Sequence, residues 1–142
     1  YSWKILLGVV IITSLVGVLD YYTNPNVQRE QWRQAVNYVN SISNPKTSIS
    51  LFVFPEPFAP IQWYKLNNPA LGIAPKFNLT DQDLVRTKEL ITSKNSVYLF
   101  QYLTGLTDPQ NKIHTYLRGL GYIQERILNY PGVGFIYIYD KN

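Results

Sequence analysis

The first strong pattern in the chain is an uncharged apolar run from Ile5 to Leu19, which reads ILLGVVIITSLVGVL. As a helix this run rises about 22 Å, so its aromatic flanks are needed to cross a hydrocarbon layer about 30 Å thick. Tryptophan and tyrosine favour the membrane interface, and lysine extends its ammonium group into the headgroups. The pattern therefore predicts a transmembrane helix over residues 1–22, with interfacial residues Trp3, Lys4, Tyr21 and Tyr22.

Two other interpretations fit the same run. A cleaved secretory signal has a shorter apolar run and a small residue before its cleavage site, and Ser14 and Gly17 are the candidates for that position. A helix buried in a globular core is the other interpretation. Because the chain starts with Tyr1 rather than methionine, we expect it to be part of a longer protein, in which this helix is the last of several spans.

Beyond residue 22 the pattern alternates between helical and extended segments. Apolar residues three or four apart predict helices over 27–42, 81–92 and about 109–120, and a weaker pattern predicts a short helix over 58–66. Runs of β-branched and aromatic residues predict strands over 47–54, 96–103, 122–129 and 133–139, and a weaker one over 70–74. The Tyr130-Pro131-Gly132 turn joins the last two long strands into a hairpin.

Turn and capping residues mark several of these boundaries. Asn24-Pro25 and Asn44-Pro45 bracket the first helix of the domain. Thr80 is followed by two aspartates in the first turn and is expected to cap the helix from Asp81. Asp108-Pro109 is expected to open the next helix, with proline in the first helical position.

Strands that alternate with helices of about a dozen residues predict parallel pairing with right-handed crossovers. The sequence therefore predicts an α/β fold: a small three-layer domain over residues 23–142, with a mostly parallel sheet and a C-terminal antiparallel hairpin. In open sheets of this kind ligands bind beyond the carboxyl ends of the strands, so the segment from Pro55 to Tyr64 is the first place to search for a site.

Composition narrows the function classes. The chain is 46% hydrophobic and 15% charged, and about 120 residues beyond the membrane helix are enough for a single core. Its net charge of +4 is spread along the chain, without the basic stripe of a nucleic-acid-binding protein. The absence of cysteine excludes disulfides and thiolate chemistry. Lys4 at the start favours a cytoplasmic chain start, with the domain on the extracytoplasmic side.

Candidate catalytic groups are few. His114 is the only histidine, and no acid lies near it in the sequence pattern of a triad, so we interpret it as solvated or structural. Asp81 and Asp83 are explained by helix capping, without a metal ion. Glu56 stands among prolines at the exit of the first strand, where it is either an exposed turn residue or a contact to a ligand. The sequence predicts no catalytic residue, no metal site and no cofactor in this chain.

Aromatic residues are abundant, with twelve tyrosines and three tryptophans. Aromatic residues in strands ordinarily pack the core. The alternative is a platform for sugar rings or lipid headgroups, because a tyrosine presents an apolar face together with a hydroxyl. The candidates for such a platform are Trp63, Tyr64 and Lys65.

Three pieces of the sequence carry a resemblance to a known family. They are Arg29 with Trp32 after the apolar helix, Trp63-Tyr64 after a proline-rich strand exit, and the closing hairpin. Together they resemble the C-terminal part of membrane glycosyltransferases of the protein mannosyltransferase and aminoarabinose transferase superfamily, of the GT-C class. The resemblance covers nearly the whole chain, although its motifs are degenerate.

The resemblance implies an enzyme with several membrane spans that transfers a sugar from a polyprenyl-phosphate donor to an extracytoplasmic acceptor. The catalytic acid of the family lies near the start of the whole protein, so none is assigned to this chain. The expected partners are the lipid bilayer, the upstream transmembrane domain and a lipid-linked sugar or glycan acceptor. The alternative is a single-span, membrane-anchored α/β domain that binds a protein partner or an envelope glycan.

Overall fold

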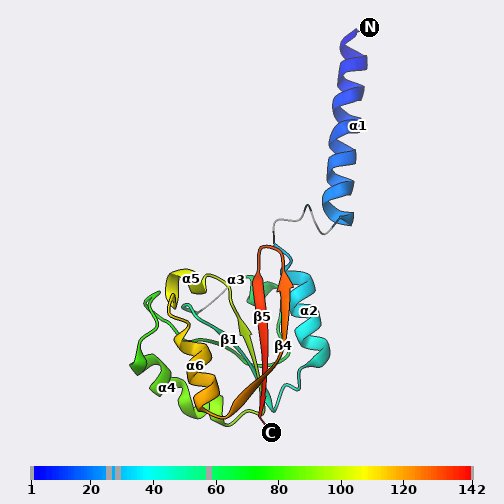
Figure 1. The fold of residues 1–142 in the computed structure, drawn as a ribbon. Helices are drawn as coiled ribbons and strands as arrows, with labels where there is room; N and C mark the ends of the chain where they lie inside the picture. Colours follow the sequence, from blue (N-terminus) through cyan, green and yellow to red (C-terminus); the bar gives the residue numbers. More distant parts are fainter. Residues whose placement is uncertain (1, 25–26, 28–29, 57–58, 142) are drawn as a thin grey trace.

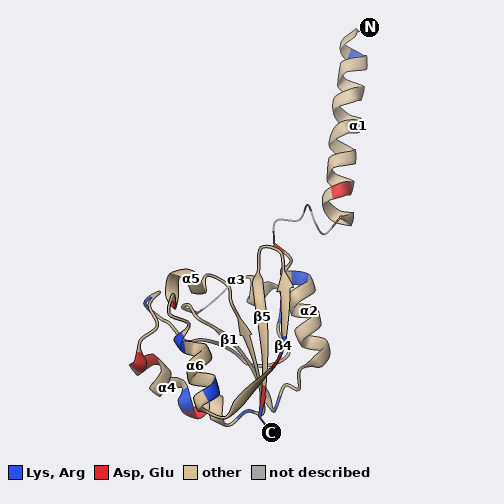
Figure 2. Ribbon diagram, viewed as in Figure 1, with Lys and Arg blue, Asp and Glu red and all other residues tan. Residues whose placement is uncertain are grey.

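The computed structural model describes residues 2–24, 27, 30–56 and 59–141, as one long helix and an α/β domain (Figure 1). Helix α1 (Ser2–Thr23) has 22 residues, none of them buried. Its length is about 33 Å at about 1.5 Å per residue. Lys4 and Asp20 are the charges along it, one near each end (Figure 2). Helix α1 is therefore long and apolar enough to cross a membrane.

Five strands form one mixed sheet in the order β2-β1-β3-β5-β4. The strands are β1 (Ser48–Phe52), β2 (Ala70–Gly72), β3 (Ser96–Phe100), β4 (Tyr122–Tyr130) and β5 (Gly134–Lys141). Strand β1 pairs in parallel with β2 and with β3, whereas β5 pairs in antiparallel with both β3 and β4.

The prediction of a mostly parallel sheet is wrong, although the predicted α/β class and the closing hairpin are confirmed. The reason lies in where the hairpin sits. The connection after β3 carries the chain to the outer edge of the sheet, where β4 forms, and the tight turn then returns β5 into the place beside β3. The longest ladder of the sheet, between β4 and β5, is therefore antiparallel.

Helices cover both faces of the sheet and give the expected three layers (Figure 1). Helices α2 (Trp32–Ile42) and α3 (Ala59–Tyr64) pack on one face, and α4 (Asp81–Thr92) and α6 (Lys112–Gly119) pack on the other. The short helix α5 (Thr104–Thr107) follows β3. Strand β1 is buried along its whole length, as the apolar run over 47–54 predicted.

Three boundaries differ from the sequence prediction for identifiable reasons. The helix expected from residue 27 begins at Trp32, because Gln31 is non-helical and donates its backbone N–H to the carbonyl of Pro131 in the hairpin turn. The strand expected over 96–103 ends at Phe100. Leu103, with its φ of 59°, immediately precedes helix α5, which the sequence did not predict. The helix expected from Pro109 begins three residues later, at Lys112.

The side chain of Asp108 explains that last difference. Its two carboxylate oxygens accept the backbone N–H groups of Lys112 and Ile113, at 2.9 and 3.0 Å. Free N–H groups at a helix start need such acceptors, so the aspartate fixes the start from four residues upstream. Helix α4 begins as predicted, with Thr80 and Asp83 forming a capping box.

The remaining predicted elements are close to the observed ones. The short helix and strand expected over 58–66 and 70–74 correspond to α3 and β2, and the hairpin strands extend a residue or two further than expected. Several residues singled out in the sequence lie outside the described part of the chain: Tyr1, Pro25, Arg29, Pro57 and Phe58.

Candidate functional site

The sequence-predicted platform residues lie at the end of the domain that is nearer to helix α1. A hollow of about 490 Å³ opens there, which we call the aromatic hollow. Helix α3 contributes Trp63 and Tyr64, and the first turn of α2 contributes Trp32. The full lining is Tyr21, Glu30, Trp32, Ala59, Pro60, Trp63 and Tyr64.

The tryptophans of this hollow are held in different ways. Trp32 is 3% exposed, stacks on Phe100 with a centroid distance of 6.1 Å, and donates its indole N–H to the carboxylate of Glu30 at 2.9 Å. Trp63 is 80% exposed. One indole therefore forms a rigid wall that belongs to the core, and the other presents its apolar surface to solvent. An indole left exposed on a helix beside a hollow is a feature of binding surfaces.

Tyr64 and Lys65 follow Trp63 at the end of α3. Tyr64 is half-buried and packs against the aromatic core under α2. Lys65 has a φ of 55° and its carbonyl accepts a hydrogen bond from the Asn40 amide at 3.1 Å. The structure thus brings Trp63 and Tyr64 together in the hollow, whereas Lys65 is not among the residues that line it.

Glu56 lines a separate and smaller hollow of about 170 Å³, together with Phe52, Phe54 and Ile61. Its carboxylate accepts the backbone N–H of Gly72 from strand β2. A Cβ at Gly72 would lie 2.5 Å from the Phe54 carbonyl oxygen, so glycine is what allows this close approach. The side chain of Glu56 therefore connects the segment after β1 to strand β2, and this contact is structural.

The aromatic residues of the strands are divided between the two interpretations that the sequence left open. Phe52, Phe54, Tyr122 and Tyr139 are buried and belong to the core. Among the described aromatic residues of the first strand and its exit, Trp63 is the exposed one. Packing thus accounts for most of the aromatic content, and the platform interpretation is narrowed to one end of the domain.

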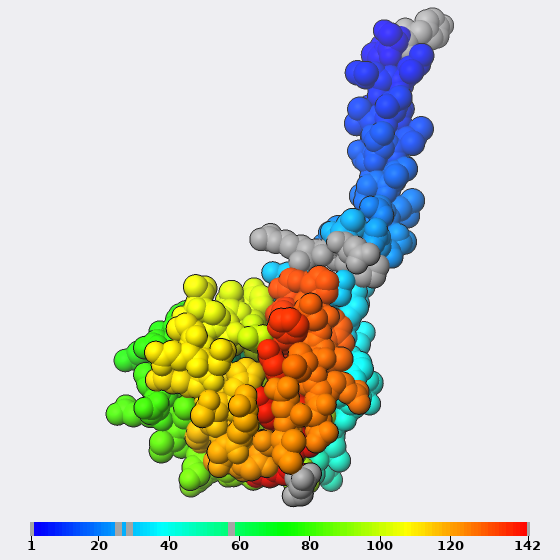
Figure 3. Space-filling model, in the orientation of Figure 1, coloured from blue at the N-terminus to red at the C-terminus, as the bar shows by residue number. Residues whose placement is uncertain are grey.

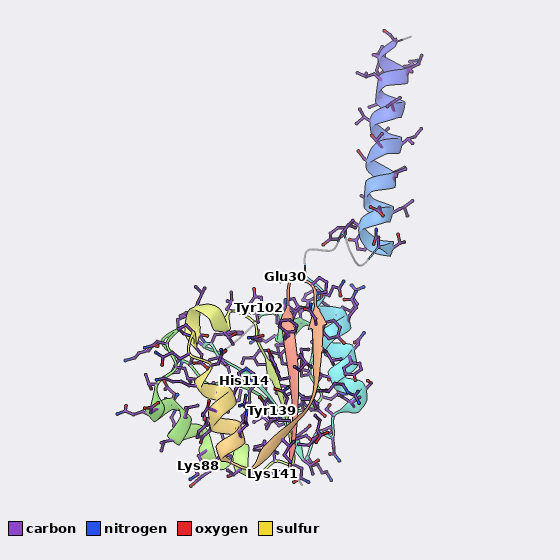
Figure 4. All side chains as sticks on the ribbon, in the orientation of Figure 1. Glu30, Lys88, Tyr102, His114, Tyr139 and Lys141 are labelled. Carbon is purple, nitrogen blue, oxygen red and sulfur yellow. The ribbon has the colours of Figure 1, made fainter. Side chains whose placement is uncertain are left out.

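A third hollow, which is polar, lies on the opposite face of the sheet from α2, between α6 and the β4–β5 hairpin. His114 on α6 and Tyr139 on β5 lie side by side there, with 2.6 Å between the His114 Nδ1 and the Tyr139 hydroxyl (Figure 4). The His114 side chain is 8% exposed, and its ring meets the ring of Tyr137 edge-on at 4.5 Å. Burial lowers the pKa of His114, and Arg118 lowers it further.

The sequence interpretation missed this cluster. It treated His114 as an isolated residue, because Tyr139 is 25 positions away and nothing local connects the two. The spacing of Tyr137 and Tyr139 places both side chains on one face of a strand. This pattern indicates a contact with His114 only once α6 is known to cover that face.

Among residues 2–24, 27, 30–56 and 59–141, no group of three or more histidine, aspartate or glutamate side chains is arranged to hold a metal ion. No family model, curated protein or solved structure matches this chain. Helix α1 and the aromatic hollow are therefore the features that bear on function.

Proposed function

We propose that this chain is the C-terminal, non-catalytic part of a membrane-embedded glycosyltransferase. In this proposal the enzyme transfers a sugar from a polyprenyl-phosphate-linked donor to an extracytoplasmic acceptor. The supporting observation is the exposed Trp63 beside Tyr64 and Glu30, at the end of the domain that follows an apolar helix of membrane-spanning length.

The chemistry of the aromatic hollow suits a sugar. A pyranose ring has an apolar face of C–H groups, which packs on an indole, and an edge of hydroxyl groups, which donate to carboxylates. Trp63 offers the exposed indole, and Glu30 offers a carboxylate already oriented by the Trp32 N–H. The rigid Trp32 wall gives the pair a fixed background, which reduces the entropy lost on binding.

The position of the hollow suits a lipid-linked sugar. Residue 30 is seven residues beyond the end of helix α1, and Tyr21 of that helix contributes to the lining. In the proposal the chain start lies in the cytoplasm, as Lys4 favours, and the domain lies outside, in contact with the bilayer and with the upstream transmembrane domain. A headgroup sugar at the membrane surface would then be within reach of the domain.

Binding to the full chain in phospholipid nanodiscs tests the proposal. Titration calorimetry would use water-soluble, short-chain polyprenyl phosphates that carry mannose, glucose or aminoarabinose. We expect one of them to bind, and Trp63→Ala to weaken that binding roughly tenfold, because an aromatic contact contributes about 0.5–1.5 kcal/mol beyond its buried area. Leu106→Ala is the matched control, since Leu106 is also strongly exposed and does not line the hollow. Equal binding by the two variants would refute a role for the hollow.

A second experiment tests the link to catalysis. Residues 26–142 would be deleted from the whole protein encoded by the source gene, and sugar transfer would be measured in membranes. If the truncated enzyme folded normally and transferred the sugar at an unchanged rate, the domain would have no part in the reaction. If the reading frame before Tyr1 lacked further membrane spans while Trp63→Ala still impaired binding, the chain would be the anchored glycan-binding domain of the alternative hypothesis.

A further inference from the structure

The polar hollow between α6 and the β4–β5 hairpin has a volume of about 270 Å³. In Figure 3, atoms of β5 are visible between those of α6 and β4, so this surface is open on the side of the sheet away from α2. All of its lining residues are polar: Gln101, Gln110, Asn111, His114, Thr115, Arg118, Gln124 and Tyr137. A hollow at the small end of ligand-site volumes and with this lining suits a small polar molecule.

The hydrogen bonds within the hollow leave donors free. The Tyr137 hydroxyl donates to the Gln101 carbonyl oxygen at 3.2 Å, and the Tyr139 hydroxyl donates to the Gln124 carbonyl oxygen at 3.4 Å. Each amide oxygen therefore has a partner within the protein. The NH₂ groups of both glutamines have no protein partner in the described part of the chain, and they remain available to donate hydrogen bonds to the oxygens of a ligand.

The tyrosines that hold these amides are spaced on the scale of a sugar ring. Tyr137 and Tyr139 are two residues apart on the same face of β5, which corresponds to about 6.7 Å along the strand. The two glutamines that they bond flank β5, one just after β3 and the other on β4. A single small anion does not reach both positions, whereas a six-membered ring with a substituent does.

The charge in the lining of the hollow is positive. Arg118 is the charged residue of that lining, and no carboxylate lines it. Asp108, a negative charge that acts on His114, already accepts the two backbone N–H groups at the start of α6. An arginine on a wall with free amide donors, and without a competing carboxylate, is the usual arrangement for binding an oxyanion.

We infer that the polar hollow binds an acidic sugar-sized ligand, with its carboxylate or phosphate against Arg118 and its ring oxygens against the Gln101 and Gln124 amides. This site is on the other face of the sheet from Trp63, and it does not depend on the proposed function. His114 and Tyr139 position the Gln124 side of the hollow through the 2.6 Å contact between them.

The single histidine of the chain makes the test direct, because its imidazole gives one set of resonances. The full chain in nanodiscs would be titrated with glucuronate, glucose 6-phosphate, glucose and inorganic phosphate, with NMR of His114 and calorimetry as readouts. We expect glucuronate or glucose 6-phosphate to bind and to shift the His114 resonances, and glucose and inorganic phosphate to bind at least tenfold more weakly. The acid that binds more tightly identifies the oxyanion.

Two arginine variants complete the test. Arg118→Gln removes the charge and keeps an amide donor, and we expect it to weaken binding of the acidic ligand at least tenfold without weakening that of glucose. Arg126→Gln is the matched control, because Arg126 bonds Tyr38 on the opposite face. The inference is overturned if none of the four compounds binds. It is also overturned if glucose or inorganic phosphate binds as tightly as the acidic sugars, or if the two arginine variants bind the acidic ligand equally well.

Discussion

Replacing Tyr122 with phenylalanine removes one hydroxyl that connects the hairpin to the end of helix α4. Tyr122 is buried, and its hydroxyl donates to the carbonyl oxygens of Ile91 and Lys94, the latter at 2.7 Å. A phenylalanine fills the same space but leaves the Lys94 carbonyl without this donor, whereas the Ile91 carbonyl keeps the backbone N–H of Lys94. Leaving a buried hydrogen-bonding group unsatisfied costs about 1–3 kcal/mol, so Tyr122→Phe is expected to lower the free energy of unfolding by that amount at pH 7.

The effect should depend on pH in a definite direction. Burial raises the pKa of Tyr122 from 10.0 to about 12. A tyrosine with a raised pKa in the folded state stabilises the fold in its neutral form, so the contribution is complete below pH 10 and is lost as the pH rises through 12. The full shift corresponds to roughly 3 kcal/mol, and about half of it is lost at pH 11. The difference between the native protein and Tyr122→Phe should therefore shrink by roughly 1 kcal/mol between pH 7 and pH 11.

Urea unfolding of the full chain in nanodiscs measures both effects, with the fluorescence of the buried Trp32 as the signal. Tyr22→Phe is the control, because Tyr22 is 70% exposed on helix α1. The reasoning is refuted if Tyr122→Phe changes the unfolding free energy by less than about 0.5 kcal/mol, the range of ordinary surface substitutions. It is also refuted if the difference between the two proteins does not narrow at pH 11.

Three further outcomes follow from the fold. Gly72→Ala should destabilise the domain by at least about 2 kcal/mol in urea unfolding, because its Cβ would lie 2.5 Å from a backbone oxygen. Gly119→Ala is the control: this glycine has open space around it, so the free energy of unfolding should stay within about 0.5 kcal/mol of the native value. Thr80→Ala should cost about 1 kcal/mol through the lost helix cap, and Thr80→Ser should restore most of it. The imidazole of His114 should titrate by NMR with a midpoint below 6.5, because its pKa is lowered in the folded state. Its contribution to the stability of the fold should therefore be present above pH 6.5 and be lost as the pH falls through that midpoint.

Local signals in the sequence were enough to predict most elements. Helix α4 has its cap, its acidic first turn and its apolar spacing within thirteen residues, and its bounds were predicted correctly. The hairpin has its turn and its two strands in one continuous segment. Trp63 and Tyr64 are adjacent on one short helix, so their common location was also predictable.

Features that depend on distant partners were not predictable in the same way. The start of α2 is set by the hydrogen bond from Gln31 to Pro131, a hundred positions further along the chain. The position of β5 beside β3 is a property of the whole sheet, since a hairpin pattern alone is equally consistent with an edge location. The polar hollow joins Gln101 after β3, His114 on α6 and Tyr137 on β5, and no single segment indicates it.

The bond between Gln31 and the hairpin turn has a mechanical consequence. It holds the start of the domain beside one end of β5, and Lys141 lies at the other end of that strand (Figure 1). A pulling force between helix α1 and Lys141 therefore acts along β5, which is paired with a neighbour on each side. The hydrogen bonds between β5 and its two neighbours are then loaded together in shear rather than broken one at a time. Under tension this domain should therefore unfold slowly and as a single unit.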